Sequence, residues 1–388
     1  MTSGSKHYKH IELQYSQESK RAGEPCGDVV VCDRSWNYTI IVISDGLGHG
    51  IKANIAATMA CSRILELIKR GFSIRDAFKN VVQTMHDARM KDLPYAVFTI
   101  IQVLNDGSTT ILNYEMPSPI IITNRYASLL KQRNYTLGGE VVAEANCFLD
   151  EGNSIVVTSD GVTQAGMGIT YKLGWTSEGF CGFLNNCIRT NVKYSDIRIK
   201  TLQEVNFAGG NRFGDDTTVA FINCRNGNIL NIFTGPPLEM SDDDTVVSNF
   251  LKSDGIKVVC GSSTANIVSR YLDKPLKVDS VQVNFIEPPK YSLEGIDLVT
   301  EGAVTLNQVY NILDEKPGEY AQNRGGVSTL YSLFQFADRI NFTVGKTKNE
   351  AHTDVIFRQM GVLPRTSIVP LIAEKLKKEG KLVVINYV

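Results

Sequence analysis

The sequence predicts an α+β protein of two domains, the first at residues 1–234 and the second, an α/β domain, at residues 235–388. A length of 388 residues exceeds that of one average domain. The first part is rich in apolar, β-branched runs with hairpin-like connections, and its two consecutive helical segments lie between groups of strands. This pattern favours largely antiparallel sheets covered by helices. The second part alternates strands and helices, which is typical of an α/β domain.

The first part is expected to begin with a strand at residues 10–15. Apolar residues at helical spacing predict a helix at 53–69 and a second one that follows Ser73, its N-cap, and runs to residue 90. A helical insert at 180–202 is predicted between the last two strands. The other predicted strands are 29–33, 38–44, 95–104, 108–116, 118–124, 127–132, 154–158 and 217–223.

The predicted boundary between the domains is Gly235-Pro236-Pro237, after a strand at 229–233, because two prolines cannot continue a hydrogen-bonded ladder. Ser241 followed by three aspartates predicts a helix start, since acidic residues favour the positive end of the helix dipole. The strands predicted beyond the boundary are 256–260, 281–285, 296–302, 340–345 and 382–387, and the helices are 241–253, 264–272, 305–313 and 369–378.

The composition is that of an ordinary folded protein, with 43% hydrophobic and 21% charged residues. A formal net charge of -1 gives no reason to expect nucleic acid or an anionic membrane as a partner. No apolar run approaches the ~20 residues of a membrane helix, and the N-terminus lacks the apolar core of a signal peptide. The eight cysteines include no CxxC pair, so free thiols in a reducing cytoplasm are expected.

Four short acidic motifs carry the chemistry of the chain. Their acidic residues are Asp28, Asp45, Asp160 and the pair Asp215-Asp216, and each motif lies at the end or the start of an apolar run. Strands that end on aspartate can bring distant carboxylates to one rim of a sheet, where they repel one another unless cations neutralise them. Hard oxygen ligands without histidine or cysteine suit Mg²⁺ or Mn²⁺. The sequence therefore predicts a metal-dependent enzyme.

With these motifs in order, the first ~225 residues resemble the PP2C-like (PPM) protein phosphatases, and more closely their bacterial SpoIIE-type branch. The segments that carry the resemblance are GD at 27–28, SDGLGHG at 44–50, PSP at 117–119, SDG at 159–161 and DDTTV at 215–219. Members of this branch dephosphorylate phosphoserine or phosphothreonine on regulatory proteins. Residues 240–388 resemble no family that we recognise.

The resemblance implies two antiparallel sheets sandwiched between pairs of helices, in four layers α-β-β-α, with a pair of Mn²⁺ or Mg²⁺ ions at one edge. It implies that Asp45 bridges both ions and that Asp45, Asp160 and Asp215 are catalytic. The full ligand set implied is Asp28, Asp45, the carbonyl of Gly46, Asp160, Asp215 and Asp216. Two divalent ions about 3.5–4 Å apart lower the pKa of a shared water and stabilise an in-line displacement, so no serine or cysteine nucleophile is required.

Several residues keep two interpretations each. His49 can donate a proton to the leaving oxygen or simply shape the glycine-rich turn. Arg212 can pair with substrate phosphate or lie in a surface loop. Lys20 and Arg21 lie roughly where several eukaryotic members carry an arginine that grips phosphate, but no motif fixes their register.

In the second domain, the segment at 258–268 predicts a strand, a Gly-Ser-Ser-Thr turn and a helix start, which is either an anion site or a capped βα turn. Glu350, His352 and Asp354 are either metal ligands or polar residues on a solvated face.

The function expected from these observations is a metal-dependent protein serine/threonine phosphatase in bacterial signalling, with an α/β regulatory or docking domain. By resemblance its substrate is a phosphorylated, anti-anti-sigma-like regulatory protein. Two alternatives belong to other classes: a signalling scaffold in which catalysis is incidental, and a sensor whose second domain binds a small anionic ligand and uses the phosphatase fold as output. A monomer and an oligomer both stay open.

Overall fold

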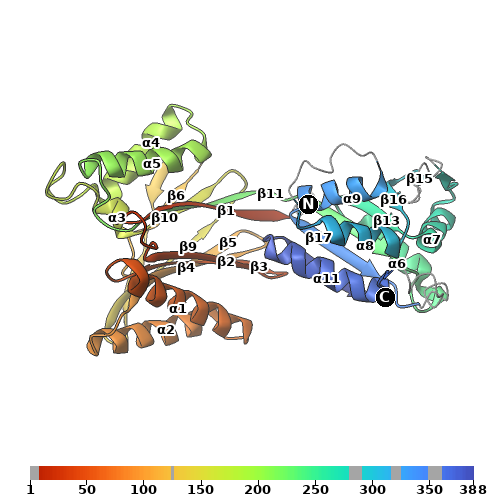
Figure 1. The fold of residues 1–388 in the computed structure, drawn as a ribbon, viewed down its shortest axis with the longest axis horizontal. Helices are drawn as coiled ribbons and strands as arrows, with labels where there is room; N and C mark the ends of the chain where they lie inside the picture. The colour runs from red at the N-terminus through yellow and green to blue at the C-terminus, as the bar shows by residue number, and fades with distance from the viewer. Residues whose placement is uncertain (1–7, 124–125, 279–290, 316–324, 348–360) are drawn as a thin grey trace, which may run out of the picture. The chain divides into compact units, whose positions relative to one another are not determined.

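The computed structural model describes residues 8–123, 126–278, 291–315, 325–347 and 361–388 (Figure 1). The chain divides into two compact units, Lys9–Asn226 and Gly227–Val388 with Tyr8, which are named the N-terminal unit and the C-terminal unit below. None of the helices in the described ranges has the length and apolarity that a membrane span requires.

The first sheet of the N-terminal unit has five strands, and every neighbouring pair in it is antiparallel. In spatial order they are β1 (Lys9–Glu18), β11 (Thr217–Asn226), β10 (Ser154–Thr158), β6 (Ile120–Ile122) and β7 (Ala127–Leu129). The first and last strands of the unit pair along their whole length, with Lys9 opposite Asn226 and Glu18 opposite Thr217. This pairing joins the two ends of the N-terminal unit.

The second sheet has six strands, again with antiparallel neighbours only. In spatial order they are β2 (Asp28–Arg34), β3 (Tyr38–Gly46), β4 (Ala96–Leu104), β5 (Ser108–Tyr114), β9 (Glu140–Phe148) and β8 (Arg133–Leu137). The hairpin of β8 and β9 lies outside the elements that the sequence predicts. Its turn consists of Gly138 and Gly139, both with positive φ.

Helices cover the outer face of each sheet, as Figure 1 shows. The second sheet carries α1 (Gly50–Lys69) and α2 (Ile74–Met90) over one apolar core, and the first sheet carries α3 (Asp160–Thr163), α4 (Thr176–Arg189) and α5 (Tyr194–Ala208) over another. A third core joins the two sheets through side chains such as Ile41 and Ile155. The layers are therefore α-β-β-α, and the predicted fold class is confirmed. The insert predicted at 180–202 consists of two helices, separated near Asn191, which has φ 53°.

The C-terminal unit contains one seven-stranded sheet with a parallel centre. In spatial order its strands are β14 (Lys277–Val278), β15 (Tyr291–Leu293), β16 (Ile296–Thr300), β13 (Ile256–Cys260), β12 (Ile229–Thr234), β17 (Arg339–Val344) and β18 (Leu382–Tyr387). The strand predicted at 281–285 lies outside the described residues. The two strands at one edge, β14 and β15, pair in antiparallel fashion.

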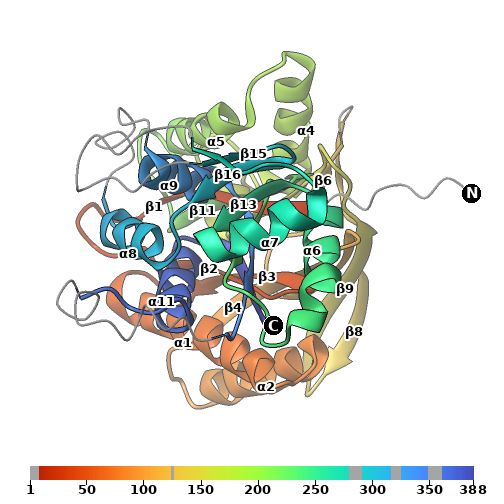
Figure 2. The same cartoon turned by 90° about the vertical axis from the view of Figure 1, so that its right-hand side faces the viewer.

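Helices cover both faces of this parallel sheet (Figure 2). On one face lie α6 (Asp243–Lys252), preceded by the turn η1 (Met240–Asp242), and α7 (Ser262–Leu272), which pack on Phe233 and Val259. On the other lie α8 (Ala303–Ile312), α9 (Gly326–Phe336) and α11 (Arg365–Lys378), which pack on Ile232 and Val258. The sequence does not predict α9. The unit is thus a doubly wound α/β domain.

The boundary between the units lies earlier than the sequence analysis places it. The predicted division at 234/235 leaves β12 with the first domain, whereas the compact units divide between Asn226 and Gly227. The reason is hydrogen bonding, because β12 lies between β13 and β17 and pairs with both in parallel fashion. Gly235 and the two prolines therefore end the first strand of the C-terminal unit.

Candidate metal centre

Asp28 and Asp45 are brought together by the pairing of β2 with β3. Asp28 is the first residue of β2, Asp45 is next to last in β3, and the two are direct cross-strand partners. Side chains of directly opposed residues lie on the same face of a sheet. The register of this one strand pair therefore places two carboxylates side by side at the edge of the second sheet.

The first sheet supplies further carboxylates from the ends of β10 and β11. Asp160 follows β10 as the first residue of the short helix α3, and Asp215-Asp216 directly precede β11. The backbone N–H of Ser159 donates to Thr218 O at 3.0 Å, which continues the pairing of the two strands up to this point. The two acidic motifs thus end at the same edge of their sheet.

Hydrogen bonds connect the two sheets at this edge. The Thr218 hydroxyl donates to Asp28 Oδ2 at 2.6 Å, although the two residues are 190 positions apart in the sequence. The other oxygen of this carboxylate, Oδ1, is buried and has no hydrogen-bond partner among the described residues. A buried carboxylate oxygen without a partner is costly unless another group, such as a cation, compensates it.

The electrostatics of the edge confirm that the carboxylates influence one another. Burial, followed by the charges of Asp28, Asp160 and Asp215, raises the pKa of Asp45 to about 9. Burial also raises the pKa of Asp28 to about 7, with the charges of Asp216 and Asp160 acting in the same direction. The pKa of Asp160 is raised by burial first and by the charge of Asp215 second. These are the conditions under which a bound cation is favourable.

The side chains do not form a closed cage as they stand. In the part of the chain that the structure describes, no three His, Cys, Asp or Glu side chains are grouped closely enough to hold one metal ion by themselves. The case for a metal centre therefore depends on the shared edge, the burial, the unpaired oxygen of Asp28 and the oxygen-only donor set. That set fits Mg²⁺ or Mn²⁺, which often keep several water ligands.

Gly46 lies directly against the start of α1. A Cβ at this position would lie 2.0 Å from the carbonyl oxygen of Ala53, so only glycine fits. The Gly46 N–H donates to Gly27 O at 3.3 Å, and the Leu47 N–H donates to Tyr95 O at 3.0 Å. Two backbone hydrogen bonds therefore fix the turn after Asp45, next to the proposed ligands.

Asp216 makes contacts that favour a structural role over the metal-ligand role that the resemblance implies. Its Oδ1 accepts the backbone N–H of Lys20 at 2.7 Å, and its Oδ2 accepts the backbone N–H of Gly27 at 2.8 Å. The residue is 4% exposed. Both carboxylate oxygens thus fasten the segment between β1 and β2 to the edge, which positions Asp28.

Lys20 and Arg21, the two candidates for gripping the substrate phosphate, form different ion pairs. The Lys20 ammonium lies 3.6 Å from Asp215 Oδ1, and both side chains are 37% exposed. Arg21 instead pairs with Glu24 at 3.5 Å and is 61% exposed. The structure therefore brings the lysine to the acidic edge. Arg212 is exposed in the loop before β11.

His49 and Gln164 complete the surroundings of the edge. His49 is the N-cap residue of α1 but makes no capping bond with its side chain. Its Nδ1 lies 3.0 Å from Glu24 Oε2, a contact that is the first cause of the lowered pKa of Glu24. Gln164 Nε2 donates to Asp160 Oδ2 at 2.8 Å. Sequence reasoning missed Gln164, although its spacing of four residues from Asp160 on a helical turn is a readable signal. The predicted cluster of Glu350, His352 and Asp354 lies outside the described residues.

Comparisons with solved structures find matches at low sequence identity. The RsbU and RsbW domains of a Mycobacterium tuberculosis protein are 16% identical, with a TM-score of 0.47, over 63% of this chain and 68% of that chain. The PP2C phosphatase domain of SpoIIE from Bacillus subtilis, solved with a fragment of its regulatory domain, is 16% identical, with a TM-score of 0.48, over 56% of this chain and 65% of that chain. The PP2C domain of SiaA from Pseudomonas aeruginosa is 17% identical, with a TM-score of 0.45, over 54% of this chain and 85% of that chain.

Sequence comparisons give a family for the N-terminal unit. No curated protein matches the chain. The family model of Stage II sporulation protein E (SpoIIE) matches residues 36–225, a range that contains Asp45, Gly46, Asp160, Asp215 and Asp216. The resemblance to the SpoIIE-type branch that the sequence predicts is therefore confirmed by this match over residues 36–225.

Proposed function

We propose that this chain is a Mn²⁺- or Mg²⁺-dependent phosphatase that removes phosphate from phosphoserine or phosphothreonine in a regulatory protein. The observation that supports this most directly is the edge at which carboxylates from both sheets gather, with Asp28 and Asp45 from one sheet and Asp160 and Asp215 from the other. The oxygen-only donor set and the match to the SpoIIE family agree with the proposal.

The residues proposed to hold two ions are Asp28, Asp45, the carbonyl of Gly46, Asp160 and Asp215. Divalent ions bound there would lower the pKa of a water molecule and stabilise the charge on the phosphate oxygens. Asp216 is assigned the different task of holding the Lys20–Gly27 segment, for which its two backbone hydrogen bonds are the evidence.

The chain's own residues supply positioning and a positive charge. Thr218 and Gln164 each donate a hydrogen bond to one carboxylate, of Asp28 and Asp160 respectively, and so fix the direction of its oxygens. Lys20, with a partly exposed ammonium next to Asp215, is the group that can bind a phosphate oxygen of the substrate. We assign His49 no step in the reaction.

A protein substrate is compatible with the exposure of the edge. The side chains of Lys20 and Asp215 are each 37% exposed, so a phosphorylated residue on the surface of another protein can reach them. The proposed substrate class is a phosphorylated regulatory protein of the anti-anti-sigma type. Its identity rests on the resemblance to the SpoIIE-type branch.

The test is hydrolysis of a phosphoserine peptide and of p-nitrophenyl phosphate by the full chain. We expect activity with Mn²⁺ or Mg²⁺, complete loss in EDTA and recovery when the metal is returned. The same peptide with phosphotyrosine serves as a control for the substrate class. Robust hydrolysis by protein that has been stripped of metal would contradict the proposal.

A further inference from the structure

The parallel sheet of the C-terminal unit has the topology of a ligand-binding α/β domain. From β12 the chain passes to β13 and then to β16 on one side, and later to β17 and β18 on the other. The strand order therefore reverses between β12 and β17. In open parallel sheets, ligands bind outside the carboxyl ends of the strands near such a reversal.

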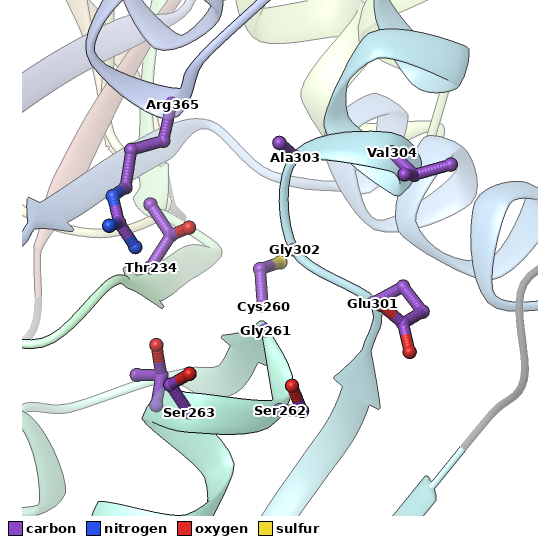
Figure 3. A pocket seen from close by; sticks show the side chains of 11 residues that line it. Thr234, Cys260, Gly261, Ser262, Ser263, Glu301, Gly302, Ala303, Val304 and Arg365 are labelled. Atoms are coloured by element: carbon purple, nitrogen blue, oxygen red, sulfur yellow. The ribbon is translucent and has the colours of Figure 1, made fainter. Parts of the chain in front are cut away.

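A cavity of about 80 Å³ lies at the carboxyl ends of three of these strands. Figure 3 shows Thr234 at the end of β12, Cys260 at the end of β13 and Glu301 after β16 around it, with Arg365 on the side opposite Glu301. One water molecule needs roughly 10–15 Å³ of such volume, so the cavity has room for a small oxyanion.

Two helices begin in the wall of this cavity. The N-cap residues of α7 and α8 are Gly261 and Gly302, and neither helix start has a side-chain cap. The first intrahelical bonds run from the N–H of Ala265 to the carbonyl of Gly261 and from the N–H of Leu306 to the carbonyl of Gly302. The N–H groups before these have no acceptor within the helix. A Cβ on Gly302 would lie 3.2 Å from the Cα of Gly261, which means that the two helix starts meet. Their positive dipole ends therefore act on the same small space.

Arg365 adds a full positive charge to the cavity. It is the first residue of α11, and its guanidinium donates to the carbonyl oxygen of Thr347 at 2.5 Å. No carboxylate of the described ranges forms an ion pair with it, and burial lowers its pKa. It packs so closely on Gly235 that a Cβ there would lie 2.2 Å from Nη1. A partly buried cation without an acidic partner is destabilising, and a bound anion would compensate its charge.

Glu301 also lines this cavity, and one oxygen of its carboxylate accepts a hydrogen bond. Its Oε1 accepts the hydroxyl of Tyr291 at 3.0 Å. In Figure 3 it lies across the cavity from Arg365. Ser262 and Ser263, in the first turn of α7, line the side between them and offer hydroxyl donors.

We propose that this cavity binds a phosphate group, either as free phosphate or at the end of a phosphate monoester, through the starts of α7 and α8 and the guanidinium of Arg365. The size of the cavity favours one tetrahedral anion, with any remaining part of the ligand outside. This site involves no divalent metal and is independent of the phosphatase proposal, which concerns the other unit.

The test measures the affinity of inorganic phosphate for the full chain by calorimetry in EDTA. Chelation prevents phosphate from binding through divalent ions at the proposed metal centre, so any binding is assigned without reference to catalysis. Chloride at equal ionic strength is the reference. Glycerol 3-phosphate is the second probe, because tighter binding of this ester than of free phosphate identifies an ester as the ligand, and the reverse identifies free phosphate.

Two variants locate the binding, and a third is the control. Ser262→Glu places a negative charge at the mouth of the cavity, while an acidic residue in the first turn favours the helix, so the fold is kept. Arg365→Ala removes the guanidinium. We expect each to weaken phosphate binding by about tenfold to 100-fold. Arg270→Ala removes an arginine of the same unit that pairs with Asp243 at 2.9 Å, and it should leave the affinity unchanged.

Two results would overturn the proposal. One is an unchanged phosphate affinity in a folded Ser262→Glu chain, as judged by its circular dichroism. The other is the absence of phosphate binding by the full chain at millimolar concentration.

Discussion

The two units place different chemical groups at the ends of their strands. In the N-terminal unit, Asp28 begins one antiparallel strand, Asp45 lies near the end of its neighbour and Asp160 follows a third, so the edge is acidic. In the C-terminal unit, parallel strands end where α7 and α8 begin, and the cavity there is lined by the starts of these helices, Arg365 and Glu301. One edge suits cations and the other suits anions.

The difference lies in which chemical groups stand at the ends of the strands. A parallel strand is followed by a crossover helix, so peptide N–H groups come to its carboxyl end whatever the side chains are. In the N-terminal unit β3 and β10 are also followed by helices, α1 and α3, but there the aspartate side chains at the strand ends make the edge acidic. The acidic edge is visible in the sequence as aspartate motifs, whereas the Gly-Ser-Ser-Thr turn at the cavity leaves two interpretations open, an anion site or a capped βα turn.

The largest expected effect concerns the strand that the sequence analysis assigns to the wrong unit. Leu230, Ile232 and Phe233 of β12 are each 0% exposed, and the strand lies between β13 and β17. We expect residues 227–388 to show a cooperative thermal transition and residues 235–388 to show none, because the second fragment lacks a central strand. Circular dichroism during heating measures both. A cooperative transition in the shorter fragment would mean that β12 is dispensable.

The next prediction concerns variants of the acidic edge, which should lower phosphatase activity without changing phosphate binding in the cavity. Asp45→Asn and Asp160→Asn should each lower phosphatase activity by on the order of 100-fold or more, because each removes a proposed ligand. Phosphate affinity measured in EDTA should stay the same. Asp33→Asn is the matched control, since Asp33 lies on the same strand as Asp28 but pairs with Lys69 at 3.1 Å. Near wild-type turnover of Asp45→Asn in saturating metal would contradict the assignment of Asp45 as a metal ligand.

The smallest effect concerns the cation at the acidic edge. Lys20→Ala should lower kcat/KM by about tenfold, because it removes a charge-assisted hydrogen bond to the substrate phosphate. Arg21→Ala changes the neighbouring cation, which pairs with Glu24, and should change kcat/KM by less than about twofold. Equal losses in the two variants would show that general positive charge, and not the position of Lys20, matters.

Much of the fold could be predicted because most elements bury a clear apolar pattern. The strand at β3 and the helices α1 and α2 are examples, with buried residues at the expected spacing. The hairpin of β8 and β9 was missed because β8 has no buried residue and β9 has an irregular pattern of exposure. The helix α9 was missed because it carries no charged residue that marks a polar face.

The candidate site could be predicted only as far as side-chain motifs extend. The sequence indicated the aspartates but not the roles of their neighbours. That Asp216 binds two backbone N–H groups, and that Lys20 and not Arg21 reaches the edge, depends on how the segment between β1 and β2 returns to β11. The bond from Thr218 to Asp28 likewise depends on tertiary pairing over 190 positions.

The direct opposition of Asp28 and Asp45 has a consequence for how the chain folds. Side chains alternate between the two faces of a strand, so a slip of one residue in the pairing of β2 with β3 would turn one of these carboxylates to the other face. A divalent ion that needs both carboxylates would then bind the correctly aligned chain and not the slipped one. By mass action, Mn²⁺ present during refolding would raise the yield of correctly paired protein. The ion would select the right alignment before any substrate is bound.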